Sequence, residues 1–410
     1  MNFEKSFLEQ EIRRTNPDYV IYIPSSDDRL KDQGNEHLHV FRAKDGRLCA
    51  LWTMSSFEGT FTHRPVISFS RDDGLTWSSP RNLLRDTINA ETGENMGSWA
   101  APAISKSGKI YVIYNKHIGK RSSKQRGRMV ILASDDCGDT WTPESVRDLP
   151  RSALDAEDTE IPVDWVIWQT ALRLSSGEVI FGYTRGWMHS RYDQSPDGVW
   201  VNHPCSCEFM QLDNIDEDPD PADLKISYFS DPNQPLAAPL RFHPELFCGE
   251  EPAICELPDG RLFCVMRTAE GHIWYSVSCD HARTWRKAEM LRFFDDGPGI
   301  EHPLSPCPIY RISAAEYVLF AHCHDGFGTA EIPQINVNWR NPVFMLKGKF
   351  RPGAHQPIWF SDPVKWMDNG EVSLRRKDLA MYADLTLEKG VPVFWYPDRK
   401  FFLLGKRIEL

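Results

Sequence analysis

The chain of 410 residues has no apolar run of the roughly 18 residues that a membrane-spanning helix needs. Its first residues, MNFEKSFLEQEIRR, are charged throughout and lack the apolar core of a secretory signal. These two absences predict a cytoplasmic protein that does not act in a membrane.

Positive charge is also scarce. The 47 Lys and Arg residues are outnumbered by 58 Asp and Glu residues, which gives a formal net charge of −11, and the basic residues are scattered along the chain. A protein that binds nucleic acid usually gathers its basic residues into a patch. The composition therefore argues against nucleic acid as a partner, and the acidic surface mainly favours solubility.

The sequence lacks the cysteine spacing of a zinc site. None of the ten cysteines forms a C-x2-4-C pair, and Cys205 and Cys207, like His322 and His324, are alternate residues of a short segment. Alternate residues share one face of a strand, which explains both pairs without a metal. Several cysteines lie inside apolar runs, so the sequence predicts buried free thiols, no metal and no cofactor.

One octet is present three times. It has the pattern S-x-D-x-[GA]-x-T-W and occurs as SRDDGLTW at residues 70–77, SDDCGDTW at 134–141 and SCDHARTW at 278–285. The aspartate can accept hydrogen bonds from nearby backbone N–H groups, the glycine permits a positive φ, and the tryptophan covers the turn. The octet is therefore predicted to stabilise a hairpin turn and to perform no chemistry.

A second repeat joins a glycine turn to an apolar strand. Its glycines are Gly46, Gly108, Gly177, Gly260 and Gly390, and residues 314–320 form a degenerate copy. Together the two repeats predict an all-β fold, a six-bladed β-propeller whose blades have four strands each. We expect residues 1–20 to form an N-terminal helix or arm and residues 21–410 to form a single propeller domain.

The octet resembles the Asp-box of the sialidase (neuraminidase) superfamily, so the chain is identified as a sialidase-like BNR/Asp-box repeat protein. Three further segments resemble that family. Glu251 opens a strand, a D-G turn follows, and the next strand ends at Arg267, while Arg340 and Tyr382 match a later arginine and the nucleophilic tyrosine. The resemblance implies that Tyr382 attacks the sugar, that Glu251 takes its proton, and that Arg267 and Arg340 bind the substrate.

The first blade departs from the family. Sialidases carry there an arginine that is the first of three carboxylate-binding arginines, and this chain has Asn35-Glu-His-Leu-His39 instead. We expect one of His37 and His39 to face the channel, with a purely structural histidine as the alternative. The segment that should supply an acidic aspartate contains none, so Glu58 or His63 is the candidate general acid, with Arg64 close by.

Three weaker candidates complete the predicted site. Trp168 and Gln169 lie near a predicted strand start, where an aromatic ring can stack on a sugar, although a core tryptophan is the commoner outcome. His355 lies in a loop that follows Arg340 and is expected to overhang the site.

These residues predict an enzyme with a carbohydrate substrate, namely an exo-acting glycoside hydrolase that removes an acidic or unusual terminal sugar. The missing arginine favours a sugar other than sialic acid, for example a uronate. Two alternatives stay open: a polysaccharide lyase that cleaves a uronate-containing glycan with His and Tyr, and a propeller that binds carbohydrate without catalysis. The sequence does not indicate the oligomeric state.

Overall fold

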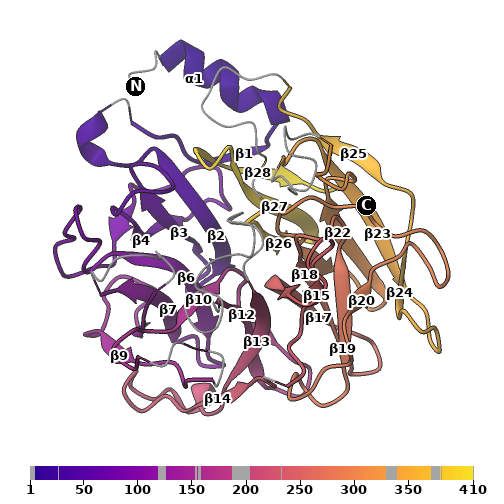
Figure 1. Cartoon of the computed structure of the whole chain (residues 1–410). Coiled ribbons are helices and arrows are strands. Elements are labelled where there is room, and N and C mark those ends of the chain that lie inside the picture. The colour runs from indigo at the N-terminus through magenta and orange to yellow at the C-terminus, as the bar shows by residue number, and fades with distance from the viewer. Residues whose placement is uncertain are drawn as a thin grey trace.

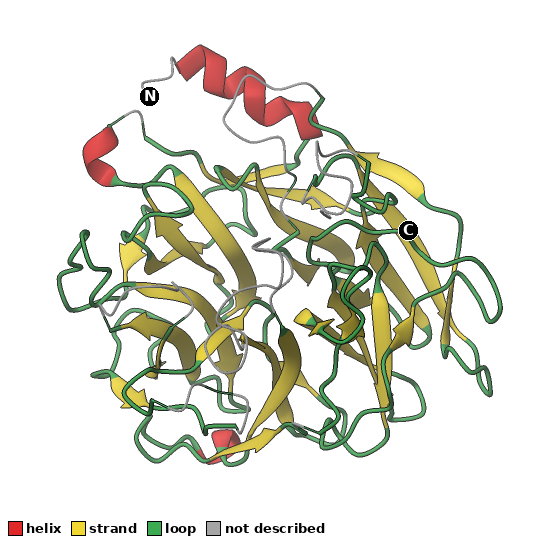
Figure 2. Cartoon of the chain, in the orientation of Figure 1, coloured by secondary structure: helices red, strands yellow, loops and turns green. Residues whose placement is uncertain are grey.

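The computed structural model describes residues 5–25, 27–118, 126–152, 155, 158–186, 204–231, 233–328, 339–370, 379 and 381–409. Strands account for most of the ordered structure, and the helices are short (Figures 1 and 2). The helical segments are α1 (Lys5–Ile12) and the 3-10 turns η1 (Arg13–Thr15), η2 (Asp28–Leu30) and η4 (Ile215–Glu217). Among the described residues, no helix has the length and apolar character needed to span a membrane.

The strands of the described residues form six separate sheets. Three consist of four consecutive strands. The first of these contains β2 (Gly34–Arg42), β3 (Leu48–Ser55), β4 (Arg64–Ser70) and β5 (Arg81–Asn82); the second contains β6 (Gly97–Ile104), β7 (Ile110–His117), β8 (Gly127–Ser134) and β9 (Ser145–Arg147); the third contains β17 (Glu250–Glu256), β18 (Leu262–Arg267), β19 (Trp274–Ser278) and β20 (Glu289–Met290).

The other sheets are less regular. A four-stranded sheet combines the N-terminal strand β1 (Tyr19–Tyr22) with the last three strands, β26 (Asp384–Glu388), β27 (Val391–Asp398) and β28 (Phe402–Arg407). A five-stranded sheet contains β21 (Ile309–Arg311), β22 (Glu316–Ala321), β23 (Val343–Phe350), β24 (Ile358–Phe360) and β25 (Val364–Met367). A seven-stranded sheet contains β10 (Asp164–Ile167), β11 (Leu172–Arg173), β12 (Val179–Gly186), β13 (Cys205–Leu212), β14 (Ile226–Phe229), β15 (Ala238–Pro239) and β16 (Phe247–Cys248).

The prediction of an all-β propeller is confirmed, but the prediction of the same number of strands in every sheet is wrong. Repeat spacing suggested that every sheet has four strands, whereas two of the sheets have five and seven. The additional strands are short and are separated from the repeats by turns, so neither the octet nor the glycine turn signals them.

Apolar side chains fill the junctions between successive sheets. Leu51 and Val112, for example, belong to one cluster that joins the β2–β5 sheet to the β6–β9 sheet. Equivalent clusters occupy the other junctions, including the one where Trp52 and Trp395 join the last sheet to the first. Because every sheet is packed on both faces, the sheets form a closed ring and the inner strands are held rigidly.

The ring is closed by strand pairing of the two chain ends. β1 pairs antiparallel with β28, and residues 19 and 20, which the sequence places in the N-terminal arm, are its first residues. Close to this strand, the Thr15 hydroxyl lies 2.6 Å from the Tyr396 hydroxyl, and Arg399 forms an ion pair with Glu11 at 2.6 Å. In Figure 1, α1 lies on the outside of the molecule next to this sheet.

The three octets form the same hydrogen-bonded turn. In the first, Asp72 accepts from the backbone N–H of Thr76 at 2.9 Å and from its hydroxyl at 2.6 Å, and the N–H of Gly74 donates to the Ser70 hydroxyl at 2.8 Å. The same contacts recur around Asp136 and Asp280. The octet is therefore a structural element, as the sequence predicts.

Candidate active site

Tyr382 lies at the centre of a buried polar cluster, just before β26. Its hydroxyl donates to Oε1 of Glu251 at 2.9 Å. Nη1 of Arg267 donates to both carboxylate oxygens of Glu251 at 3.0 Å and to the Tyr382 hydroxyl at 3.2 Å. The structure therefore brings Tyr382 next to a glutamate and an arginine of another sheet that lie 131 and 115 residues away in the sequence.

A local backbone distortion aims side chains of three sheets at this place. The first strands β2, β6 and β17 each shift register near their N-terminal ends. At each shift one residue other than glycine has a positive φ: His37 at 53°, Trp99 at 56° and Glu251 at 47°. Bulges and left-handed residues are costly and are concentrated at functional sites. No sequence pattern distinguishes these residues from neighbours with ordinary backbone geometry.

His37 packs face to face on the nucleophile candidate. The centroids of the His37 and Tyr382 rings are 4.1 Å apart at an interplanar angle of 26°, and the Trp99 ring lies 6.2 Å from His37. Both ring nitrogens of His37 are buried, and within the described part of the chain neither has a hydrogen-bond partner. Burial, and next the charge of Lys400, hold the pKa of His37 well below its ordinary value, so the imidazole is neutral.

Arg340 contributes a cation with open donors. Its guanidinium carbon lies 5.4 Å from the centroid of the Tyr382 ring. The side chain is 2% exposed, and its Nε and Nη1 atoms have no hydrogen-bond partner among the residues that the structure describes. Buried donors are nearly always satisfied in folded proteins, so these two are suited to an anionic ligand beside Tyr382.

Sequence reasoning missed Lys400, which lies in the turn between β27 and β28. Its Nζ is 4.7 Å from the centroid of the Tyr382 ring and forms ion pairs with Glu36 at 3.0 Å and Glu58 at 2.5 Å. Lys400 has a positive φ of 49°. The segment Asp398-Arg-Lys400 matches no motif, so only the spatial arrangement identifies the lysine.

Burial is the largest influence on the phenol. It raises the pKa of Tyr382, as does the neighbouring carboxylate of Glu251, whereas Lys400, Arg267 and Arg340 lower it. Because the raising effects dominate, the phenol is protonated at neutral pH and needs a base in order to attack.

The two candidate acids lie beside the cluster. Glu58 reaches it through its ion pair with Lys400. His63 is buried, and its Nδ1 lies 3.1 Å from the hydroxyl of Ser98, the residue next to Trp99. The structure does not distinguish between them, so both assignments stay predictions.

Trp168 and Gln169 contribute to packing rather than to an open sugar platform. Trp168 is completely buried, its indole N–H donates to the carbonyl of Pro252 at 3.0 Å, and its ring meets Tyr382 edge-on with centroids 6.3 Å apart. The side-chain oxygen of Gln169 accepts the N–H of Ile254 at 2.9 Å. Both residues bind the backbone of β17, which agrees with the packing alternative, and their contact with a substrate stays a prediction.

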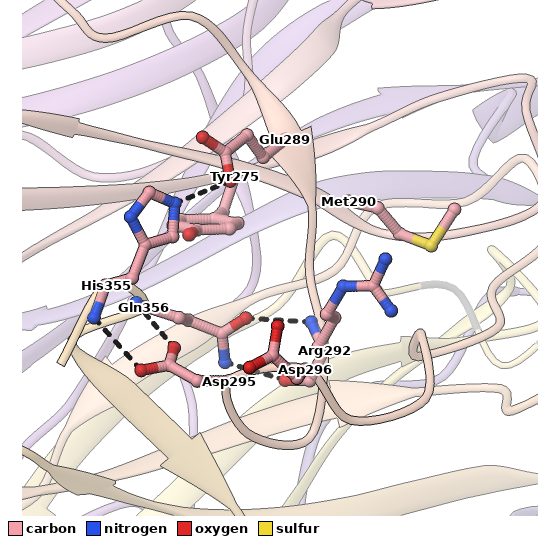
Figure 3. A pocket seen from close by; sticks show the side chains of 8 residues that line it. All are labelled: Tyr275, Glu289, Met290, Arg292, Asp295, Asp296, His355 and Gln356. Atoms are coloured by element: carbon pink, nitrogen blue, oxygen red, sulfur yellow. Dashed lines mark hydrogen bonds and ion pairs between the residues drawn. The ribbon is translucent and has the colours of Figure 1, made fainter.

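Arg64 and His355 lie outside the cluster. Arg64 donates to the carbonyls of Leu30 at 2.7 Å and Lys31 at 3.1 Å, because β4 is not the innermost strand of its sheet. His355 lies 2.8 Å from Glu289 of β20 and lines a cavity of about 330 Å³ (Figure 3). β20 and the Glu251-bearing β17 are opposite edges of one sheet, so His355 does not overhang the site.

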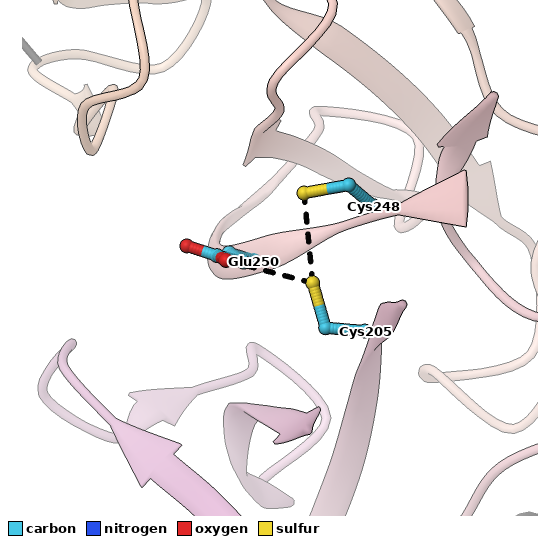
Figure 4. Close-up of side chains that lie close together, drawn as sticks. All are labelled: Cys205, Cys248 and Glu250. Atoms are coloured by element: carbon cyan, nitrogen blue, oxygen red, sulfur yellow. Dashed lines mark hydrogen bonds between the residues drawn. The ribbon is translucent and has the colours of Figure 1, made fainter. Parts of the chain in front are cut away.

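Three side chains of the described residues that can ligate a metal gather next to Arg267. They are Cys205, Cys248 and Glu250, whose ligand atoms all lie within 4.8 Å of one another (Figure 4). All ten cysteines are free thiols, as the sequence predicts.

Comparison with known proteins agrees with this architecture. The profile of the BNR repeat-like domain family matches residues 46–301, and a search of curated proteins returned no match. The Hadza microbial sialidase Hz136 is similar in structure, with a TM-score of 0.63 over 93% of this chain and 67% of its own at 12% identity.

Two further solved structures are similar over almost the whole chain. The intramolecular trans-sialidase from Ruminococcus gnavus has a TM-score of 0.59, 13% identity, and coverage of 95% of this chain and 97% of its own. The NanB sialidase from Streptococcus pneumoniae has a TM-score of 0.57, 13% identity, and coverage of 95% and 69%. At these identities the structural likeness shows a shared fold. Since the family profile spans more than half of the chain, this sialidase-like protein belongs to the BNR repeat-like domain family.

Proposed function

We propose that the protein is an exo-acting glycoside hydrolase that removes an acidic or unusual terminal sugar, with Tyr382 as nucleophile and Glu251 as its base. The observation that carries this proposal is the 2.9 Å hydrogen bond from the Tyr382 hydroxyl to Glu251, with Arg267 in contact with both groups. The sialidases of similar fold support a carbohydrate substrate.

The chemistry requires a proton transfer within this pair. As the Tyr382 oxygen forms a bond to the anomeric carbon, its proton passes to Glu251, and the glycosidic C–O bond breaks. The departing oxygen takes a proton from an acid, for which Glu58 and His63 are the candidates. Water then attacks the anomeric carbon as the bond from that carbon to the Tyr382 oxygen breaks. The proton of the water goes to the same acid residue, and Glu251 returns its proton to the tyrosine oxygen.

The arginines differ in their availability. Arg267 already forms ion pairs at 3.0 Å, from Nη1 to Glu251 and from Nε to Glu250, although its Nε makes no hydrogen bond to the described residues. Arg340 has open buried donors. A substrate carboxylate would therefore bind mainly to Arg340. Because the first arginine of the family is missing, fewer cations are present than a sialidase uses, which supports another acidic sugar such as a uronate over sialic acid.

The test is a screen of 4-methylumbelliferyl glycosides, including glucuronide, galacturonide and sialoside, with the wild-type chain and Tyr382→Phe. We expect fluorescence release from an acidic glycoside and a loss of kcat of roughly 100-fold or more in the variant, because the nucleophile is removed. Tyr228→Phe is the matched control, since the one hydrogen bond of its hydroxyl to the described residues goes to the Met129 sulfur at 4.0 Å. Turnover that survives Tyr382→Phe would exclude the tyrosine as nucleophile.

One observation favours a second candidate, a lyase acting on a uronate-containing polysaccharide. His37 is neutral and stacks on Tyr382, and its two nitrogens are unpartnered. A neutral imidazole can take the proton next to the uronate carboxylate while Tyr382 protonates the leaving oxygen. Elimination produces an unsaturated uronate that absorbs ultraviolet light, whereas hydrolysis does not. Binding of glycan without either product would indicate a non-catalytic propeller.

A further inference from the structure

Two cysteines and a glutamate meet where three strands come together. Cys205 begins β13, Cys248 ends β16, and these two residues pair in a parallel bridge. Glu250, which begins β17, follows two residues later. The Sγ atoms of Cys205 and Cys248 are 3.5 Å apart, and Cys205 Sγ lies 3.6 Å from Oε1 of Glu250 (Figure 4).

These distances correspond to the edges of a metal coordination shell. A tetrahedral zinc ion with its usual Zn–S and Zn–O distances holds neighbouring sulfur and oxygen ligands about 3.5–3.8 Å apart. We propose that Cys205, Cys248 and Glu250 form a binding site for a thiolate-preferring divalent cation of the Zn²⁺ type. The three protein ligands leave a fourth position for water.

The surroundings of the two thiols suit a metal better than a free thiolate. Cys205 and Cys248 are 4% and 1% exposed, and they pack with Leu240, Leu246 and Leu304. Binding of M²⁺ by both sulfurs releases two protons to solvent and forms two metal–thiolate bonds.

Glu250 has a partner on each side. Its Oε1 faces Cys205, while its Oε2 lies 3.0 Å from Nε of Arg267. A dication neutralises the two thiolates, and Arg267 shares its charge between Glu250 and Glu251. Glu250 thus links the proposed cation to Arg267, the arginine that contacts Tyr382. A bound cation would hold Glu250 in place, and Glu250 would in turn fix the position of Arg267.

A disulfide is the competing use of this pair. A disulfide would require the two sulfurs to approach to about 2.05 Å, and a pair joined in this way would not bind a cation. The structure has them at 3.5 Å as free thiols, with the carboxylate directed at one of them.

The test uses the full chain, reduced with a phosphine and stripped with a chelator, and then titrated with Co²⁺ followed by Zn²⁺. We expect a thiolate-to-cobalt charge-transfer band that saturates at about one ion per chain, proton release on binding, and loss of the band when Zn²⁺ displaces Co²⁺. Zn²⁺ should also raise the melting temperature of the wild-type chain.

Variants assign the site. Cys205→Ser and Cys248→Ser should each weaken cobalt binding at least 10-fold, whereas Cys279→Ser should not, because Cys279 is exposed and outside the cluster. Circular dichroism checks that each variant is folded. A wild-type chain that shows no charge-transfer band, a band that persists in the Cys205→Ser/Cys248→Ser double variant, or reduced thiols that form a disulfide instead of binding the ion would each overturn the proposal.

Discussion

At the scale of single residues, three cations converge on one phenol and are neutralised to different degrees. Arg267 is paired with Glu250 and Glu251, and Lys400 with Glu36 and Glu58. Arg340 has buried donors without partners. Arg340 is therefore the cation best able to bind an anion directly beside Tyr382. For the paired cations, removing one member of a pair leaves the charge of the other member buried.

Arg340→Met should weaken the binding of an acidic glycoside by roughly 10- to 100-fold in KM, because a charge-assisted contact contributes about 1.5–3 kcal/mol. Hydrolysis of a neutral glycoside, where detectable, should change less. Arg64→Met is the matched control, since Arg64 contacts backbone carbonyls outside the cluster. Equal KM values for Arg340→Met and wild type would contradict the assigned role.

Lys400→Met should lower the free energy of unfolding by about 3–5 kcal/mol, because it removes the 3.0 Å ion pair between Lys400 and the buried carboxylate of Glu36. Urea unfolding of the single variants and of Lys400→Met/Glu36→Gln forms a double-mutant cycle. The double variant should recover part of the loss. If it is as unstable as the sum of the single variants, the two groups are not coupled.

At the scale of the elements, the inner strands carry the site and the outer turns stabilise the sheets. The shared bulge of β2, β6 and β17 directs His37, Trp99 and Glu251 inward. The octets lie after the third strands of their sheets, at the opposite end of each sheet order from the bulged strands. Changes in an octet should therefore affect stability more than chemistry.

Asp136→Ala should cost about 1–2 kcal/mol, since the carboxylate accepts from the Thr140 N–H at 2.8 Å and hydroxyl at 2.6 Å. The first cause of its lowered pKa, about 2, is the Thr140 hydroxyl. Because this folded-state pKa lies below the unfolded value, the contribution is present at neutral pH and is lost as the pH falls towards 2. Asp135→Ala, an exposed neighbour paired only at 3.4 Å with Lys109, should change stability little.

At the scale of the whole molecule, closure of the ring and the buried ionisable groups determine stability. β1 completes the last sheet, and Arg399 lies buried between Glu11 and Asp398. Four histidines, His37, His39, His302 and His322, are buried and have lowered pKa values. The contacts of Arg399 connect segments near the two ends of the chain, and the buried histidines make the free energy of unfolding depend on pH.

Glu11→Ala should destabilise the closed ring by roughly 1.5–3 kcal/mol, because Arg399 loses one of its two charged partners. Glu9→Ala on the same helix is the control, since its side chain is exposed. Thermal unfolding followed by circular dichroism measures both. Identical melting temperatures would show that α1 contributes little to closure.

The stability of the molecule should fall as the pH drops below about 6.5. Burial lowers the pKa of His39 and His302 to about 3, so the unfolded chain binds protons that the folded chain does not between these pH values. Burial raises the pKa of Asp384 to about 6 and also raises the pKa values of Glu208 and Glu250, and these three carboxyls act in the opposite direction as the pH falls. Urea unfolding at pH 7, 6 and 5 measures the slope, and His39→Gln should reduce it; stability that rises on acidification would contradict this balance.

The sequence by itself determined the architecture and four members of the cluster. The octets and the glycine turns predict the propeller because the conformation of a hairpin turn depends on residues that are close together in the sequence. The positive φ that such turns require is present at Gly46, Gly108, Gly177, Gly260 and Gly390. The meeting of Tyr382 with Glu251, Arg267 and Arg340 was expected from the family resemblance, and their chemical roles stay predictions.

Only the tertiary structure decided the rest. Lys400, the bulged His37 and the contact of Cys205 with Cys248 depend on which strand ends meet after the ring closes. It likewise placed Trp168 in the core, the alternative that the sequence favours, and His355 at an outer edge, where its proximity to Arg340 in the sequence was misleading. The physical reason is that local patterns encode turns and strands, whereas the distances between side chains of different sheets follow from how those sheets pack.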